Sequence, residues 1–422
     1  MPLSPIREIT TLDSQPLLPS FNTGDEDYHP QIAKDIDFNF AGKDTQHSTH
    51  AIHPYVAAIN PPLARALISH YVPERAAVLD PFCGGGGVLV EALLGDRRGI
   101  GCDINPLAVL ISRVKTTRLP YDVTVRDYTR ILNEALATHD VDDVPDLIQY
   151  WYTPKSLAPL CALRSAINLT TNQKVRELFQ VILSATARDV MLTYRGEIRL
   201  RKLQGKDLEK FQPDIFSAFR KRAELALTRV AQLPEGGPAR VYMSDARQID
   251  DAQRFHTVIT SPPYADDTNG VGYFQFSRNM LYWIGVSLDE QKEQRRSFLG
   301  CGGTNGGPID APPSEMLMGV LAVIAQRNQT HYKQALHFYN DYYSALRRIA
   351  RTVEARAIII IGDRVLSRTH INNGRITTEL LNTLDFELEH YYTRQITKKR
   401  IPNLGGDGGG TSVEHILVYR RR

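Results

Sequence analysis

The sequence of 422 residues predicts an α/β fold, with a central sheet of seven strands that is interrupted by a helical insertion. Short runs of aliphatic and β-branched residues alternate with segments whose apolar residues recur at helical spacing. The first two runs enclose a glycine-rich turn, and strand signals stop between about residues 120 and 237. Alternation of strands and helices is typical of a sheet whose strands are mainly parallel.

Seven apolar runs are the expected strands. Ala357 to Asp363 is a continuous aliphatic run, which suits a central strand buried on both faces. A loop rather than a helix joins the last two runs, so the final strand is expected to be antiparallel. The expected strands are 76–79, 98–103, 240–245, 256–260, 357–363, 387–393 and 415–419.

Helical spacing accounts for most of the remaining chain. The expected helices near the strands are 62–71, 88–94, 105–111, 333–353 and 375–384, and those of the insertion are 123–138, 155–169, 173–190 and 207–233. Residues 1–45 lack periodicity and are expected to be an arm, and the glycine-rich stretch 300–307 is expected to be a mobile loop. Pro234 to Pro238 is a linker. We therefore divide the chain into an arm (1–45), a main domain (46–119 and 238–422) and a helical insertion (120–237).

Composition is that of an ordinary globular protein, with 42% hydrophobic and 23% charged residues. No apolar run reaches the roughly 18 residues that cross a membrane, and the first residues lack a signal-peptide pattern. The four cysteines are scattered, which predicts neither disulfides nor a metal site and favours a cytoplasmic setting. A net charge of +3 permits a nucleic-acid partner without requiring one.

A glycine run, Asp80-Pro81-Phe82-Cys83-Gly84-Gly85-Gly86-Gly87, separates the first strand from a helix. Glycine lets the backbone approach a ligand closely, and the helix N-terminus offers free N–H groups. The second strand ends at Asp103, where a carboxylate can accept hydrogen bonds from ribose hydroxyls. This unit predicts a site for a cofactor that contains adenosine.

Three histidines lie close together upstream, at positions 47, 50 and 53. A metal site is not expected there, because the segment offers neither a cysteine nor a pair of histidines at helical i, i+4 spacing.

A second motif, Thr260-Ser261-Pro262-Pro263-Tyr264, directly follows an expected strand. Together, the glycine run and Ser-Pro-Pro-Tyr resemble the S-adenosylmethionine-dependent methyltransferases that modify exocyclic amino groups of DNA bases. The resemblance covers about residues 45–118 and 238–422. It implies a Rossmann-like, seven-stranded methyltransferase sheet, with S-adenosylmethionine as the cofactor.

The resemblance also implies the cofactor contacts. Asp80 is expected to bind the amino group of the cofactor, Asp103 its ribose and Asp245 its adenine, while the segment around His53 and Tyr55 closes over the methionine end. The full expected set is Asp80, Pro81, Phe82, Cys83, Gly84, Gly86, Asp103, Ile104, Asp245, Ala246, His53 and Tyr55.

The expected catalytic residues are Ser261, Pro262, Pro263 and Tyr264. Methyl transfer to an amino nitrogen requires donor and acceptor to be held in line. The Ser261 hydroxyl and the Pro262 carbonyl can accept hydrogen bonds from the target amino group, which favours its nucleophilic, pyramidal form. The two prolines stiffen the loop. Tyr264 offers a face on which a flipped-out base can stack.

The motifs bear on four alternative functions. Serine before Pro-Pro-Tyr favours cytosine N4 over adenine N6 as the target. A tRNA guanine-N2 methyltransferase has a similar glycine run, but its second motif usually begins with Asp. Methylation at cytosine carbon needs a nucleophilic cysteine, usually after proline, and the sequence has no Pro-Cys. A binding module with an inactive cofactor fold is disfavoured by the intact motifs.

Two basic regions are expected to contact the phosphates of double-stranded DNA, because Lys and Arg provide affinity there and the resembled family carries similar stretches. They comprise Arg195, Arg199, Arg201 and Lys202 in the insertion, and Lys398, Lys399 and Arg400 near the C-terminus. A cognate restriction endonuclease is a candidate partner that the sequence does not specify.

Overall fold

The computed structural model describes residues 38–422, apart from 57, 139–142, 195–199, 237–238, 265–272, 302–309 and 397–412. Residues 31–422 form one compact unit. The expected arm thus lies almost entirely outside the described residues, as does nearly all of the expected mobile loop at 300–307.

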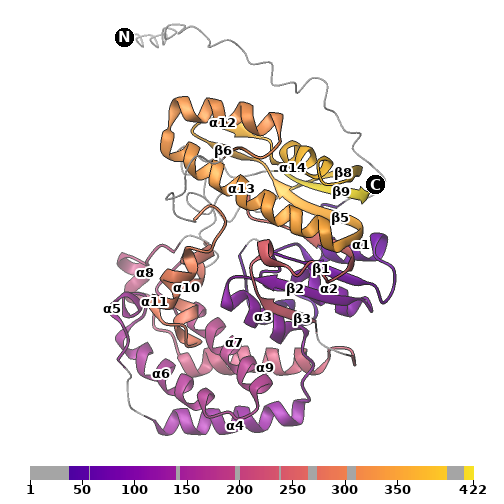
Figure 1. Cartoon of the computed structure of the whole chain (residues 1–422). Coiled ribbons are helices and arrows are strands. Elements are labelled where there is room, and N and C mark those ends of the chain that lie inside the picture. Colours follow the sequence, from indigo (N-terminus) through magenta and orange to yellow (C-terminus); the bar gives the residue numbers. More distant parts are fainter. Residues whose placement is uncertain are drawn as a thin grey trace, which may run out of the picture. The chain divides into compact units, whose positions relative to one another are not determined.

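The main sheet has seven strands in the order β3-β2-β1-β4-β5-β9-β8 (Figure 1). The pairs from β3 through to β5 are parallel, whereas β9 pairs antiparallel with β5 and with β8. The predicted α/β sheet and its antiparallel final strand are therefore confirmed. The strands are β1 (Ala77–Asp80), β2 (Arg98–Asp103), β3 (Arg240–Met243), β4 (Phe255–Thr260), β5 (Val353–Gly362), β8 (Phe386–Gln395) and β9 (Val413–Arg421).

Helices cover both faces of this sheet. In β5, Ile358 and Ile360 pack with α1 and α2, whereas Ile359 and Ile361 pack with α12, α13 and α14. This alternation follows from the two-residue period of a strand, and it explains the continuous aliphatic run. The helices are α1 (Pro61–Tyr71), α2 (Gly87–Leu94), α3 (Pro106–Thr116), α12 (Glu315–Arg327), α13 (Gln329–Thr352) and α14 (Asn373–Asn382).

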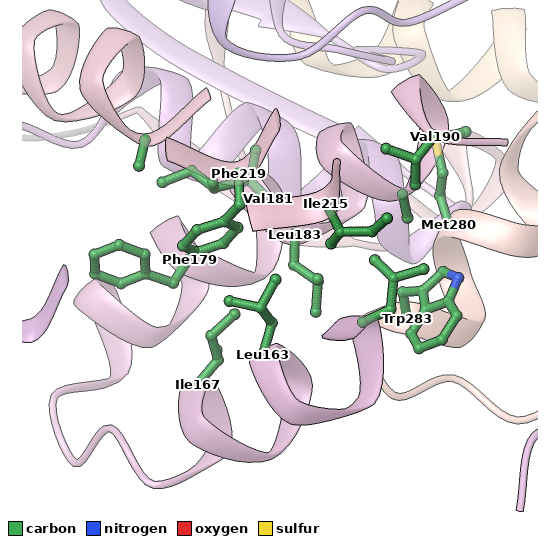
Figure 2. Packing of buried hydrophobic residues seen from close by; sticks show 14 of the residues in the cluster. Leu163, Ile167, Phe179, Val181, Leu183, Val190, Ile215, Phe219, Met280 and Trp283 are labelled. Carbon is green, nitrogen blue, oxygen red and sulfur yellow. The ribbon is translucent and has the colours of Figure 1, made fainter. Parts of the chain in front are cut away.

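The insertion is helical over its described residues, and its helices share one hydrophobic core with neighbouring parts of the chain. That core includes α3 as well as α10 and α11, which follow the Ser-Pro-Pro-Tyr motif (Figure 1). Figure 2 shows Phe179 and Phe219 facing one another among aliphatic side chains. The helices are α4 (Tyr121–Ala137), α5 (Asp146–Gln149), α6 (Pro154–Asn168), α7 (Gln173–Asp189), α8 (Gly205–Lys210), α9 (Ile215–Ala231), α10 (Tyr273–Trp283) and α11 (Leu288–Arg295).

One expected helix is wrong in the structure. The segment 207–233 forms two helices, α8 and α9, rather than one. Pro213 lacks an N–H group and disfavours helical geometry at the residue before it. Asp214 then begins α9 by accepting a hydrogen bond from the Ser217 N–H at 3.0 Å.

Several elements were not expected, among them the helices α5, α10, α11 and α12 and four short elements. A small hairpin, β6 (Arg364–Leu366) with β7 (Thr369–Ile371), follows β5. Two 3₁₀ helices, η1 (Ser48–Ile52) and η2 (Ala246–Gln248), lie before β1 and after β3.

We expect Phe219→Ala to destabilise the protein by about 3 to 5 kcal/mol, because it removes a fully buried ring from a packed core. Chemical denaturation followed by circular dichroism measures the change. Leu136→Ala is the matched control, since Leu136 is 47% exposed on α4 and should change the free energy of unfolding by less than about 0.5 kcal/mol. Equal effects of the two substitutions would contradict the prediction.

Among the described residues, no helix is both long and apolar enough to cross a membrane.

Candidate active site

The glycine run forms the turn between β1 and α2, as predicted. Gly84 and Gly86 have φ angles of +48° and +77°, which other residues rarely adopt. A Cβ on Gly86 would also lie 2.8 Å from the hydroxyl oxygen of Ser112. Gly86 is the N-cap of α2, so the turn and the start of the helix both require glycine at this position.

Asp80 ends β1 and is buried. Its Oδ1 accepts hydrogen bonds from the Thr260 hydroxyl at 2.7 Å and from the Phe82 N–H at 3.2 Å. Burial raises the pKa of Asp80 to about 7, although these hydrogen bonds oppose the shift. Thr260 directly precedes Ser261, so one hydrogen bond joins the two sequence motifs.

Asp103 ends β2 beside the glycine turn. Its two carboxylate oxygens accept hydrogen bonds from the N–H groups of Gly84 at 2.9 Å and Asn105 at 2.8 Å. Burial raises the pKa of Asp103 to about 6, against the effect of these backbone hydrogen bonds. The carboxylate is therefore held in one orientation at the edge of the sheet.

A pocket lies at the carboxyl ends of β1, β2 and β4. This is the edge at which open parallel sheets bind their ligands. Both sequence motifs contribute to one lining. The predicted site residues in this lining are Tyr55, Asp80, Pro81, Phe82, Cys83, Gly84, Asp103, Ile104, Asp245, Ala246, Ser261 and Pro263.

Four predicted site residues do not line the pocket: His53, Gly86, Pro262 and Tyr264. His53 is buried, and its Nε2 lies 3.0 Å from the Ser184 hydroxyl of α7. Burial lowers the pKa of His53 to about 3, so its ring is neutral. Pro262 is buried. The Tyr264 hydroxyl lies 3.2 Å from the Ser261 hydroxyl.

Tyr55 packs over the glycine turn and lines the pocket, while its contact with the methionine end of the cofactor stays a prediction. A Cβ on Gly85 would meet the Tyr55 side chain at 2.7 Å. The Tyr55 hydroxyl accepts a hydrogen bond from Asn105 Nδ2 at 3.0 Å, and its ring meets Phe276 of α10 edge to face. Tyr55 therefore joins the turn to the helices that follow the second motif.

Asp245 lies in the pocket lining, but its carboxylate already has a partner. It accepts hydrogen bonds from the Arg247 backbone N–H at 2.8 Å and from the Arg247 guanidinium at 2.5 to 3.0 Å, and it is the N-cap of η2. Arg247 also donates to the carbonyl of Ser297 at 2.9 Å. The contact between Asp245 and adenine remains a prediction.

One wall of the pocket could not be predicted. Ser297, Phe298 and Leu299 line it from the segment after α11, and Arg247 ties this segment to η2. Phe298 and Leu299 are buried and apolar, as expected for a wall against an adenine ring. Their sequence has no motif, and only the folded chain brings them into the same pocket lining as Phe82 and Asp103.

Two of the three upstream histidines, His47 and His50, form a hydrogen-bonded cluster around Glu91 of α2. His47 Nε2 and His50 Nε2 lie 2.6 and 2.8 Å from the same oxygen of the buried Glu91, and Arg65 Nε lies 2.8 Å from the other oxygen. Ligands of a tetrahedral zinc ion at 2.0 to 2.1 Å would lie about 3.3 Å apart. The observed distances are shorter than this, and one partner is an arginine, so the contacts are those of hydrogen bonds. The cluster holds η1 against α2, and η1 leads directly to Tyr55.

Part of the predicted DNA-contacting set is described. Arg201 stacks on the Tyr194 ring at 4.2 Å, and Lys202 lies 3.7 Å above the Tyr150 ring. Arg195, Arg199, Lys398, Lys399 and Arg400 lie outside the described residues. The role of the whole set remains a prediction.

The pocket has the groups that S-adenosylmethionine needs. Asp103 offers carboxylate oxygens to a ribose, Asp80 offers a carboxylate to an ammonium group, and the apolar wall suits an adenine. S-adenosylmethionine held by these residues would supply an activated methyl group in the pocket that Ser261 lines.

We expect cofactor affinity to fall as the pH is lowered from 7 to 5. The pKa of Asp103 is raised to about 6 and that of Asp80 to about 7, so both carboxylates take up protons in this range and lose their charge. The dissociation constant should rise about tenfold or more by pH 5. Calorimetric titration measures it, with Asp103→Asn expected to flatten the dependence. A constant affinity would contradict the prediction.

Comparisons with known proteins find DNA methyltransferases similar to this chain. The family model for N6/N4 DNA methylases matches residues 21–113, which include the glycine run and Asp103. The type II methyltransferase M.MvaI of Kocuria varians is 26% identical, over 90% of this chain and 92% of that protein. The tRNA (guanine(10)-N2)-dimethyltransferase of Methanocaldococcus jannaschii is 43% identical, but over only 16% of this chain and 19% of that protein.

Solved methyltransferase structures are also similar to this chain, but only at low TM-scores. TrmN from Thermus thermophilus has a TM-score of 0.28 at 11% identity, covering 86% of this chain and 49% of that chain. The magnesium protoporphyrin IX methyltransferase from Synechocystis has a TM-score of 0.31 at 9% identity, covering 92% and 86%. The chain is thus similar to N6/N4 DNA methylases over residues 21–113 and to a type II methyltransferase over nearly its whole length.

Proposed function

We propose that this protein transfers a methyl group from S-adenosylmethionine to the exocyclic N4 of cytosine in double-stranded DNA. The observation that carries the proposal is that Ser261 and Pro263 line the same pocket as Gly84 and Asp103. Acceptor and donor sites thus share one cavity. The similarity to a type II methyltransferase over nearly the whole chain supports a site-specific modification enzyme, whose cognate restriction endonuclease would be a partner.

The pocket is concave and opens at one edge of the sheet, so a base must leave the duplex to reach it. In this proposal the Ser261 hydroxyl and the Pro262 carbonyl accept hydrogen bonds from the amino group of the flipped cytosine. Tyr264 stacks on the base. Geometry that holds donor and acceptor in line supplies much of the acceleration in such a displacement.

The basic residues of the insertion are proposed to hold the DNA backbone. Lys202 and Arg201 lie on aromatic rings, which limits their freedom and keeps their charges at the surface of the insertion. Contacts of this kind supply affinity without sequence information. The residues that read the target sequence are proposed to lie in the insertion and in the segment 265–330.

Two other targets remain as alternatives. Adenine N6 would use the same geometry, with a different base in the pocket. Guanine N2 in tRNA is supported by the local identity to the archaeal dimethyltransferase, but that match is limited to about a fifth of that protein.

Mass spectrometry of nucleosides distinguishes the three targets. The protein is incubated with isotopically labelled S-adenosylmethionine and either unmodified DNA or tRNA. Label in N4-methylcytosine is the expected result. Label in N6-methyladenine would mean that the target is adenine N6 and not cytosine N4. Label only in tRNA guanine would overturn the proposal.

A further inference from the structure

A chain of hydrogen bonds leads from Ser261 away from the pocket. The Ser261 hydroxyl lies 3.2 Å from the Tyr264 hydroxyl, and Tyr264 donates a hydrogen bond to Glu414 Oε1 at 3.0 Å. Glu414 lies on β9, where it faces Gly362 of β5 and Arg394 of β8. The last strand of the chain, β9, therefore brings a carboxylate to the second sequence motif.

The number of hydrogens on each group determines which group donates in these hydrogen bonds. The Tyr264 hydroxyl has one hydrogen, and Glu414 accepts it. Tyr264 must then accept from Ser261, so the Ser261 hydrogen points away from the pocket. The lone pairs of Ser261 are thereby left for the N–H bonds of a substrate amino group.

Charged groups surround Glu414 on several elements. Arg394 Nε lies 2.6 Å from Glu414 Oε2, and both side chains are less than one-fifth exposed. Asp363, which directly follows β5, is paired with His415 and His370 at 3.1 and 3.2 Å. Burial would raise the pKa of Asp363, but its histidine partners lower it well below its usual range, so the proton-accepting group beside Tyr264 is Glu414.

A serine hydroxyl cannot retain a proton taken from an amino group, because a protonated alcohol is a very strong acid. A carboxylate at that position could retain it. The sequence has serine there, and the structure supplies a carboxylate two hydrogen bonds away.

We propose that Ser261, Tyr264 and Glu414 form a proton relay that takes the proton from the methylated amino group; this inference rests on the proposed function. As the nitrogen lone pair bonds to the methyl carbon, the bond from that carbon to the cofactor sulfur would break, its electron pair staying on the sulfur of S-adenosylhomocysteine, and the nitrogen would carry an extra positive charge. Its N–H proton passes to Ser261 Oγ, the Ser261 proton passes to the Tyr264 oxygen, and the Tyr264 proton passes to Glu414. The products are a neutral methylamino group, unchanged Ser261 and Tyr264, and a protonated Glu414, which later releases its proton to solvent.

Glu414→Gln tests the relay while keeping the side-chain shape. The amide oxygen is expected to turn to Arg394 and the amide NH₂ to Tyr264, which reverses the chain and makes Ser261 a donor toward the pocket. We expect kcat to fall about 10- to 100-fold. The Kd for S-adenosylmethionine and the KM for DNA should change less than about twofold, since Glu414 does not line the pocket. Tyr264→Phe keeps the ring and should lower kcat similarly, and the double variant should be no slower than either alone.

Glu389→Gln is the matched control. Glu389 also pairs with an arginine on the same sheet, with 2.7 Å between Arg356 Nε and Glu389 Oε2, and it has no contact with the pocket lining. Its kcat should remain that of the wild type. Rates are measured at saturating cofactor on amplified, unmodified phage DNA, with thermal unfolding as the check on folding.

The split between kcat and the binding constants separates a relay from a purely structural role, because loss of the relay lowers kcat and leaves cofactor and DNA binding unchanged. A Glu414→Gln rate within about threefold of wild type, or a parallel loss of cofactor binding, would overturn the relay. If the wild-type protein labels no DNA, the proposed function is wrong and the relay falls with it; if only the variant results disagree, the relay alone is wrong.

Discussion

Ser261→Ala should lower kcat for DNA methylation about 100- to 1,000-fold. In the proposed function, the substitution removes a hydrogen-bond acceptor for the target amino group and the first member of the hydrogen-bonded series that leads to Glu414. Loss of one preorganised hydrogen-bonding group at a reacting centre typically has an effect of this size. Single-turnover labelling of DNA at saturating cofactor measures it.

Cofactor binding should survive the same substitution. The Ser261 hydroxyl pairs with Tyr264, whereas Asp80 and Asp103 take their hydrogen bonds from other groups. The Kd for S-adenosylmethionine is therefore expected within about twofold of wild type. Ser344→Ala is a suitable control, because Ser344 is exposed on α13 and bonds only a carbonyl of its own helix. Wild-type turnover in Ser261→Ala would remove Ser261 from the mechanism.

Asp103→Ala should weaken S-adenosylmethionine binding about 100-fold. The carboxylate is oriented by the N–H groups of Gly84 and Asn105, and a charged acceptor contributes roughly 1.5 to 3 kcal/mol for each hydrogen bond. Two ribose hydroxyls are expected to bind there. Isothermal titration calorimetry measures the loss directly.

A second variant separates binding from support of the glycine turn. Asp103→Asn keeps an oxygen for one backbone N–H but loses the charge, so we expect an intermediate loss of about tenfold. Asp122→Ala, an exposed change on α4, is the control. At saturating cofactor, kcat of Asp103→Asn should approach that of wild type. If cofactor affinity is unchanged in both Asp103 variants, the ribose assignment is wrong.

The cofactor half of the site could be predicted because it is local. One strand, one glycine turn, one helix and a second strand bring Asp80, Gly84 and Asp103 together within a short stretch of chain. Parallel neighbours place their carboxyl ends at one edge, so the acid that ends β2 must lie beside the turn after β1. Strand positions were also predictable, since buried strands are continuous aliphatic runs.

Prediction was poorer where two signals competed. The apolar spacing from 207 to 233 suggested one helix, but Pro213 interrupts it, and the local backbone requirement of proline outweighs the periodicity. Conversely, His53 was expected to help close the cofactor site, yet it is buried against α7. The local sequence His-Pro-Tyr is the same whether the histidine lines the cofactor pocket or packs against α7, so it could not distinguish the two positions.

The sequence by itself determined the type of fold, the cofactor turn and the presence of a second motif after β4, because each depends on spacing along the chain. The tertiary structure alone decided that Phe298 and Leu299 complete the pocket and that Glu414 reaches Tyr264. The latter contact exists because β9 inserts between β5 and β8, which carries a residue from the end of the chain to the loop after β4. Such pairing depends on the order of strands in the sheet, and no local pattern of residues encodes it.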